Sequence, residues 1–185
     1  PKSSKPVQEN CSSISTDCGL FDSVAVAGEL ELALVYNTNT STLEITVGAC
    51  RNLTYGDTKR RKCHPYIKLH VLPEKGGKMK TTVKKNTTDP VYNEVLKYQI
   101  ERHLLFGKRL QATVWHSGTL KRKVFLGEVL LPLDGWRFED KTSKCLTWYP
   151  LCPKVSSSII SQFNFNIFYP FCHIFIELLI VTVDH

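Results

Sequence analysis

Apolar and polar residues alternate along two neighbouring stretches that begin at Gly28 and Thr42. Successive side chains of an extended strand point to opposite faces, so each stretch carries its large aliphatic side chains on one face. These apolar positions are Leu30, Leu32, Leu34, Leu43, Ile45 and Val47. A short polar segment, residues 37–41, separates the two stretches, and the pattern therefore predicts a β-hairpin.

Six further segments show strand patterns at the spacing that is typical of a β-sandwich. They cover residues 66–72, 78–85, 94–100, 109–116, 125–131 and 146–151. Residues 102–106 are compatible with a single helical turn. Eight short strands joined by polar loops, with almost no helix, predict an all-β fold, an eight-stranded antiparallel β-sandwich.

The composition changes on either side of this strand-rich region. Residues 1–27 are rich in Ser and Asp and are predicted to be a disordered linker, and residues 28–154 are predicted to form one domain. Residues 155–185 are strongly apolar and long enough to span a bilayer, but polar residues interrupt them and no Lys or Arg follows. We expect a tail outside the domain, such as an alternative C-terminus, with a transmembrane span as the alternative.

The net charge of the chain is +7, and the positive charge is concentrated in the strand-rich region. Residues 28–154 contain 22 Lys and Arg against 12 Asp and Glu, a net charge of +10. A basic domain attracts polyanions such as nucleic acid, anionic lipid or an acidic protein. Nucleic-acid binding typically interleaves aromatic and basic residues on one strand face, and only Tyr66 does so here, so we expect no nucleic-acid partner.

The chain carries no familiar signature of catalysis or of metal binding. Its seven cysteines lack any zinc-ligand spacing, so we expect reduced thiols, no metal site and no cofactor. No G-x-S-x-G, P-loop or H-E-x-x-H motif is present, and we expect that the protein is not an enzyme. No apolar signal sequence follows the first residues, which favours a cytoplasmic location.

Four short motifs resemble, in order, those of the C2 domain family. They are Pro-Tyr-Ile-Lys-Leu-His-Val-Leu-Pro at 65–73, Thr-Asp-Pro-Val-Tyr-Asn-Glu at 88–94, Leu-Gly-Glu at 126–128 and Trp-Tyr-Pro-Leu at 148–151. Segments at 51–57, 62–66, 96–98, 114–120 and 124–129 look most like the first C2 domain of the synaptotagmin-like proteins. Those proteins are Rab effectors that tether secretory vesicles to the plasma membrane. Their Rab-binding helices have no counterpart here, so Rab binding lies outside this chain.

The same resemblance locates the positions at which many C2 domains bind calcium. Asp57 stands where the family pattern has its first Asp, but His64 replaces the second, and the third loop has His116, Gly118 and Val124 at its Asp positions. Calcium takes six to eight oxygen ligands, and one carboxylate cannot supply them. The resemblance and the charge of the loops therefore predict that the domain acts without calcium.

A cluster of basic residues is predicted on the two strands at 66–72 and 78–85. Strand alternation places one tyrosine and four lysines on the outer face, opposite Met79 and Val83. The resemblance implies that this cluster binds phosphoinositides, and its members are Tyr66, Lys68, Lys78, Lys80 and Lys84. Closely placed cations suit a polyphosphorylated inositol ring.

The loops at 59–62 and 121–123 add seven consecutive or nearly consecutive cations. We expect them to contact the membrane, and they are Lys59, Arg60, Arg61, Lys62, Lys121, Arg122 and Lys123. The sequence thus predicts calcium-independent binding of anionic membrane, with phosphatidylinositol 4,5-bisphosphate as the expected lipid, at the plasma membrane or secretory vesicles during docking and exocytosis. The alternative is a protein-interaction domain that binds an acidic exocytic or trafficking protein through the same face.

Overall fold

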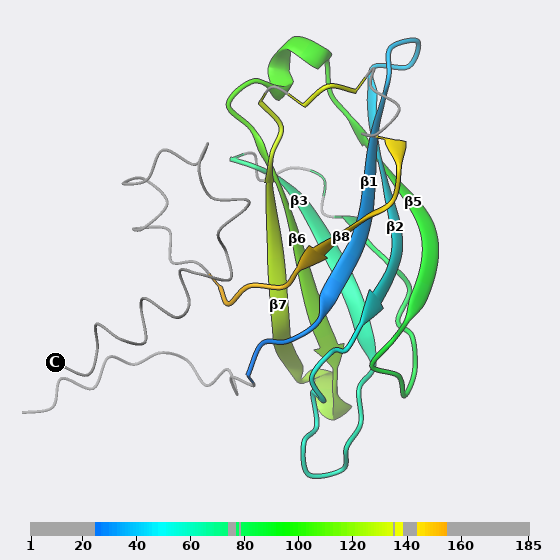
Figure 1. The fold of residues 1–185 in the computed structure, drawn as a ribbon, viewed down its shortest axis with the longest axis vertical. Helices are drawn as coiled ribbons and strands as arrows, with labels where there is room; N and C mark the ends of the chain where they lie inside the picture. Colours follow the sequence, from blue (N-terminus) through cyan, green and yellow to red (C-terminus); the bar gives the residue numbers. More distant parts are fainter. Residues whose placement is uncertain (1–24, 74–76, 78, 135, 139–143, 155–185) are drawn as a thin grey trace, which may run out of the picture.

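Two four-stranded antiparallel sheets pack face to face in the computed structural model, which describes residues 25–73, 77, 79–134, 136–138 and 144–154. The strands are β1 (Glu29–Asn37), β2 (Thr42–Arg51), β3 (Pro65–Leu72), β4 (Met79–Lys80), β5 (Val91–Gln99), β6 (Arg109–Ser117), β7 (Lys123–Pro132) and β8 (Thr147–Pro150). One sheet has the order β5-β2-β1-β8 and the other β4-β3-β6-β7. Figure 1 shows the elongated sandwich that they form. The predicted all-β sandwich is confirmed.

The hydrophobic core lies between the sheets and uses the alternation seen in the sequence. The six apolar positions of the first hairpin are fully buried, and they face the equally buried Ile67, Leu69 and Val71 of β3. The predicted hairpin is confirmed, and its last pair next to the turn is Asn37 with Thr42. Burial of a large aliphatic side chain contributes about 1.5–3 kcal/mol, so this layer is the main source of stability.

The segment predicted as a strand at 78–85 forms a regular ladder over two residues only. Thr81 turns inward after β4, and its side-chain oxygen accepts the N–H of Ile67 at 3.0 Å, where a strand would offer a carbonyl. The chain stays beside β3, because the N–H groups of Thr81 and Lys84 donate to the carbonyls of Ile67 and Pro65 at 3.0 Å, but the pairing is irregular. Val83 is 45% exposed instead of lying on the inner face, so that part of the prediction was wrong. Thr82 is hydrogen bonded to the Glu94 carboxylate of β5, which links the edges of the two sheets.

Two connections meet at one end of the sandwich, the lower end in Figure 1. One runs from β2 to β3 and contains a tight turn in which Asp57 and Lys62 exchange backbone hydrogen bonds of 2.9 and 3.0 Å. The other runs from β6 to β7 and contains the short 3₁₀ helix η2 (Thr119–Lys121). The predicted helical turn is a second 3₁₀ helix, η1 (Arg102–Leu105).

The chain after β8 returns to the second sheet. Glu128 of β7 and Cys152 exchange two backbone hydrogen bonds of 2.9 Å, which joins the edge of β7 to the segment that follows β8. The predicted linker up to residue 24 and the predicted tail at 155–185 lie outside the described residues. Among the residues that the structure does describe, no helix is long and apolar enough to cross a membrane.

Candidate functional site

The outer face of β3 and β4 carries a pair of lysines in direct register. Lys68 and Lys80 are Cα partners in the antiparallel ladder, so their side chains point to the same face. Their neighbours Ile67 and Leu69 are fully buried on the opposite face, which fixes the outward direction of Lys68. The predicted juxtaposition of these two strands is confirmed for Lys80, whereas Lys78 lies outside the described residues.

Aromatic side chains support Lys68 on this face. Its Nζ lies 4.4 Å from the ring centroid of Trp115 and 5.8 Å from that of Tyr66, the two being Cα partners on β6 and β3. Trp115 in turn packs edge-to-face on Phe125, with centroids 5.4 Å apart. Tyr66 is only 6% exposed, and this burial raises the pKa of its phenol. We call the outer surface formed by Tyr66, Lys68, Lys80 and Trp115 the strand face.

Lys84 does not lie in this row. Its Nζ is 5.7 Å from the ring centroid of Tyr92, which belongs to β5 in the other sheet. The irregular pairing after Thr81 explains the difference: the N–H of Lys84 still donates to the carbonyl of Pro65 at 3.0 Å, but residues beyond Thr81 no longer follow the alternation of a strand. Lys84 therefore lies at the edge between the two sheets.

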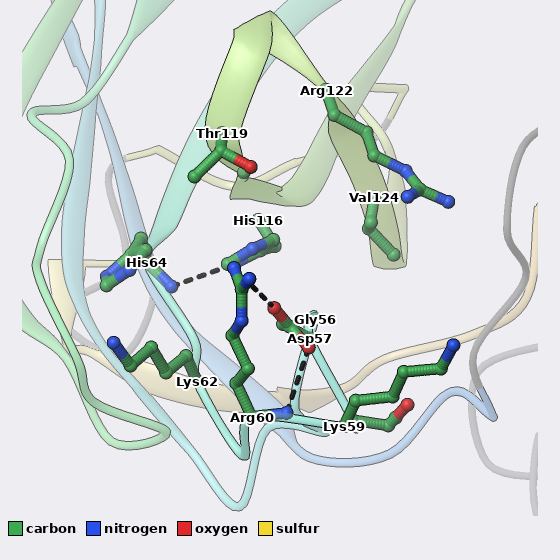
Figure 2. Close-up of a pocket in the computed structure, with 12 residues that line it drawn as sticks. Gly56, Asp57, Lys59, Arg60, Lys62, His64, His116, Thr119, Arg122 and Val124 are labelled. Carbon is green, nitrogen blue, oxygen red and sulfur yellow. Dashed lines mark hydrogen bonds and ion pairs between the residues drawn. The ribbon is translucent and has the colours of Figure 1, made fainter.

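A cavity of about 690 Å³ opens between the two connections at the lower end of the sandwich. Its lining residues include every position that the family pattern assigns to calcium, namely Asp57, His64, His116, Gly118 and Val124. Figure 2 shows Arg60 and Lys62 on one side of this space and Thr119 and Arg122 on the other, with His116 between them. We call this the loop cavity.

The residues at these positions do not fit a calcium ion. Glycine and valine offer no side-chain oxygen, and imidazole is a poor ligand for a hard cation that prefers oxygen. The one carboxylate, that of Asp57, accepts the backbone N–H of Arg60 at 3.0 Å and lies 3.9 Å from the Arg60 guanidinium. Its charge is thus already compensated from within the same loop.

Two stacked imidazoles form the inner wall of the loop cavity. The rings of His64 and His116 lie 5.4 Å apart at 21°. Nδ1 of His116 accepts the N–H of His64 at 2.8 Å, and Nδ1 of His64 accepts the N–H of Asn86 at 2.9 Å. Since a backbone N–H can only donate, both Nδ1 atoms are unprotonated, and the proton of each neutral ring resides on Nε2. Burial, and secondly the neighbouring His64, lowers the pKa of His116, against an opposing effect of Asp57.

The sequence analysis grouped seven loop cations together, but the structure separates those that line the loop cavity from those that do not. Lys59, Arg60, Lys62 and Arg122 line the loop cavity. Arg61 instead lies over the ring of Tyr55, 5.5 Å from its centroid. Lys123 is exposed at the start of β7, and the side chain of Lys121 is outside the described part of the chain.

One exposed apolar residue was missed by the sequence analysis. Leu120, within η2, is fully exposed and has a left-handed backbone conformation with φ of 52°, which is uncommon for leucine. It projects from the same loop that supplies Arg122 to the cavity. In the sequence, the only indication of this exposed residue is a single leucine between Thr119 and a run of basic residues.

Comparison with known proteins shows the same fold and a closer similarity to one group of proteins within it. The sequence profile of the C2 domain matches residues 41–151, and the chain belongs to the C2 domain family. Over 153 residues it is 43% identical to synaptotagmin-like protein 2 of Mus musculus, which covers 82% of this chain and 16% of that protein. It is 39% identical over 135 residues to mouse synaptotagmin-like protein 1, covering 73% of this chain and 23% of the relative.

The resemblance to synaptotagmin-like proteins is therefore confirmed, although the chain spans about a sixth of the length of synaptotagmin-like protein 2. Among solved structures, the crystal structure of a C2 domain of RIM from Drosophila is similar, with a TM-score of 0.63 and 26% identity. That likeness covers 69% of this chain and 100% of the Drosophila domain. The strand region is thus a C2 β-sandwich of the synaptotagmin-like type.

Proposed function

We propose that this C2 domain binds anionic, phosphoinositide-bearing membrane without calcium and serves vesicle docking in exocytosis. It acts as a binding module at the cytoplasmic surface of the plasma membrane or of secretory vesicles, without catalysis. The observation that carries the proposal is the register of Lys68 and Lys80 on neighbouring strands.

Like charges directly opposite each other destabilise a sheet. Two lysines in register, such as Lys68 and Lys80, therefore favour the binding of an anion. Phosphate groups on an inositol ring match this need, because each offers several acceptor oxygens to closely placed ammonium groups. The rings of Tyr66 and Trp115 contact the ammonium group of Lys68 and position it over the sheet.

The proposal of calcium independence is supported by the ligands at the loop positions. Asp57 is the only carboxylate among the residues that line the loop cavity, and four cations line the same cavity. These cations attract the phosphate groups of a membrane and repel a divalent ion. The positive charge of the loops therefore replaces calcium in attracting the domain to an anionic membrane.

Sedimentation of the 185-residue chain with liposomes tests the proposal. Liposomes with and without phosphatidylinositol 4,5-bisphosphate would be compared in EGTA and in calcium. Each basic residue near an anionic surface contributes about 1 kcal/mol, so Lys68→Gln/Lys80→Gln is expected to weaken binding about thirtyfold. The matched control is Lys97→Gln/Lys144→Gln, which removes two lysine charges elsewhere and is expected to bind like the parent.

Three outcomes would contradict the proposal. Equal binding by the strand-face variant and the control would show that the register of Lys68 and Lys80 has no role. A requirement for calcium would contradict the interpretation of Asp57. Binding to an acidic protein but not to phosphoinositide liposomes would favour the protein-interaction alternative.

A further inference from the structure

We propose that the loop cavity is a second anion site, which binds a phosphomonoester group of an inositol polyphosphate in the space where related domains hold calcium. The inference deepens the proposed function, because it gives the loops a defined ligand in place of a general attraction to the membrane. The ligand chemistry is the same whether the inositol phosphate is a lipid headgroup or a soluble molecule.

The first support is the charge of the lining. Four cations, Lys59, Arg60, Lys62 and Arg122, face one carboxylate, so the described lining carries a net charge of +3 when both histidines are neutral. Cations gathered around one concave space repel each other, and the walls focus their field on an entering ion. An anion in the cavity relieves this repulsion.

The second support is the arrangement of hydrogen-bond donors. The backbone amides that occupy Nδ1 of His64 and His116 leave Nε2–H of each ring as a donor without protonation. The position of one donor is known, because a Cβ added to Gly118 would lie 3.6 Å from Nε2 of His116, and Gly118 lines the cavity. Neutral imidazole donors beside guanidinium groups suit a phosphate oxygen.

The third support comes from the two connections that supply these groups. Arg60 and Lys62 belong to the turn closed by the Asp57–Lys62 backbone bonds, and Arg122 follows η2, where its N–H is bonded to Thr119. Figure 2 shows the cations on opposite sides of the imidazole pair. A ligand between them contacts both connections, and a volume of about 690 Å³ is in the range of small-molecule sites.

The arrangement also separates cavity cations from other cations on the same loops. Arg61 lies over Tyr55 and Lys123 stands at the start of β7, and neither lines the cavity. A double substitution of these two residues removes as much charge from the same loops as a double substitution of Lys62 and Arg122. Comparing the two double variants therefore distinguishes binding in the cavity from a general electrostatic attraction by the loops.

The test is calorimetric titration of the 185-residue chain with inositol 1,4,5-trisphosphate. The parent is expected to bind at two sites, the strand face and the loop cavity. Lys62→Gln/Arg122→Gln is expected to weaken one site at least about tenfold, since each lost charge-assisted hydrogen bond costs about 1.5–3 kcal/mol. Arg61→Gln/Lys123→Gln is expected to stay within about twofold of the parent.

NMR of the parent chain locates the ligand without any substitution. The imidazole signals of His64 and His116 are expected to shift on addition of inositol 1,4,5-trisphosphate, and at the same concentrations as the calorimetric binding. Equal weakening by the two loop variants, or histidine signals that do not respond, would overturn the inference.

Liposomes distinguish the source of the ligand and separate this inference from the proposed function. If Lys62→Gln/Arg122→Gln also loses binding to phosphatidylinositol 4,5-bisphosphate liposomes, the cavity takes the lipid headgroup. If it keeps liposome binding, the ligand is soluble inositol phosphate. Full liposome binding by Lys68→Gln/Lys80→Gln would contradict the proposed function and leave the calorimetric result for the cavity standing.

Discussion

The strand face and the loop cavity both gather positive charge, but the fold positions that charge in different ways. On the strand face, Lys68 and Lys80 are fixed by the ladder of β3 and β4, whose inner side is fully buried core. In the loop cavity, Arg60 and Lys62 belong to a short turn, and Arg122 lies on a separate connection. The first surface depends on packing, and the second on a few hydrogen bonds.

This difference has a consequence for selectivity. Cations in a fixed register present a constant spacing to a ligand, which favours one pattern of phosphate groups. Cations on two separate connections are not fixed to each other by a strand ladder. The hydrogen bonds from the N–H of His64 to His116 and from the N–H of Ser117 to His64 join the first connection to the end of β6. The strand face should therefore select the ligand more strictly than the loop cavity.

The largest expected effect is on membrane binding by Leu120, a residue outside both anion-binding surfaces. Leu120 is fully exposed beside the loop cations, so Leu120→Ser should weaken binding to phosphoinositide liposomes. Burying a leucine side chain contributes about 1.5–3 kcal/mol, which corresponds to about tenfold to a hundredfold. The free energy of unfolding and the affinity for soluble inositol 1,4,5-trisphosphate should not change.

Sedimentation and calorimetry of the same variant check this prediction. Leu104→Ser is a suitable control, because Leu104 is also exposed but lies in η1, outside both anion-binding surfaces. Equal losses of liposome binding for the two variants would show that exposure alone, and not the place of Leu120, is responsible.

The next effect concerns the stability of the strand face. Thr81→Val keeps the shape of the side chain but removes the oxygen that accepts the N–H of Ile67. A buried N–H without a partner costs about 1–3 kcal/mol, which urea denaturation would measure. The control Thr82→Val loses only an exposed hydrogen bond to Glu94 and should cost less. Equal stability of the two variants would show that the inward turn at Thr81 is not what holds β4.

The smallest effect is a pH dependence confined to the loop end. Burial lowers the pKa of His116 below the ordinary 6.5, so the unfolded chain takes up a proton at a pH where the folded chain does not. The contribution to stability is therefore complete above pH 6.5 and is lost as the pH falls from there to the folded pKa. His116→Asn keeps an acceptor for the His64 N–H and should reduce this slope in urea denaturation at pH 7.5, 6.5 and 5.5. An unchanged slope would contradict the assignment.

Much of the sandwich could be predicted because a strand repeats every two residues. The alternation at Leu30, Leu32 and Leu34 identified the core face, and the pattern at 66–72 placed Lys68 outward. The resemblance to C2 domains supplied the pairing of the two strands and placed Lys68 across from the row of Lys78 and Lys80, and the structure adds the register of Lys68 with Lys80. The alternation along the strands and the resemblance to C2 domains together predicted that Lys68 and Lys80 lie on one face.

The features that the sequence analysis did not predict depend on contacts of individual side chains, which no periodic pattern along the chain indicates. The side-chain oxygen of Thr81 takes the place of one carbonyl acceptor in the ladder, after which the pairing becomes irregular and Val83 is exposed. The seven loop cations divide according to whether each turns toward the cavity or, like Arg61, toward a neighbouring ring. The histidines were recognised as departures from a calcium site, but their stacking depends on a hydrogen bond between residues 52 positions apart.

The early end of β4 also bears on how copies of this domain behave when they are crowded. Strand edges with unpaired backbone groups are templates on which another chain can add a strand and begin to aggregate. At one edge of the second sheet, β4 offers a regular ladder of two residues, and one of them is the charged Lys80. At the other edge, Cys152 already occupies the backbone groups of Glu128. The β4 edge of the sheet that carries the strand face is thus poorly suited to edge-to-edge polymerisation.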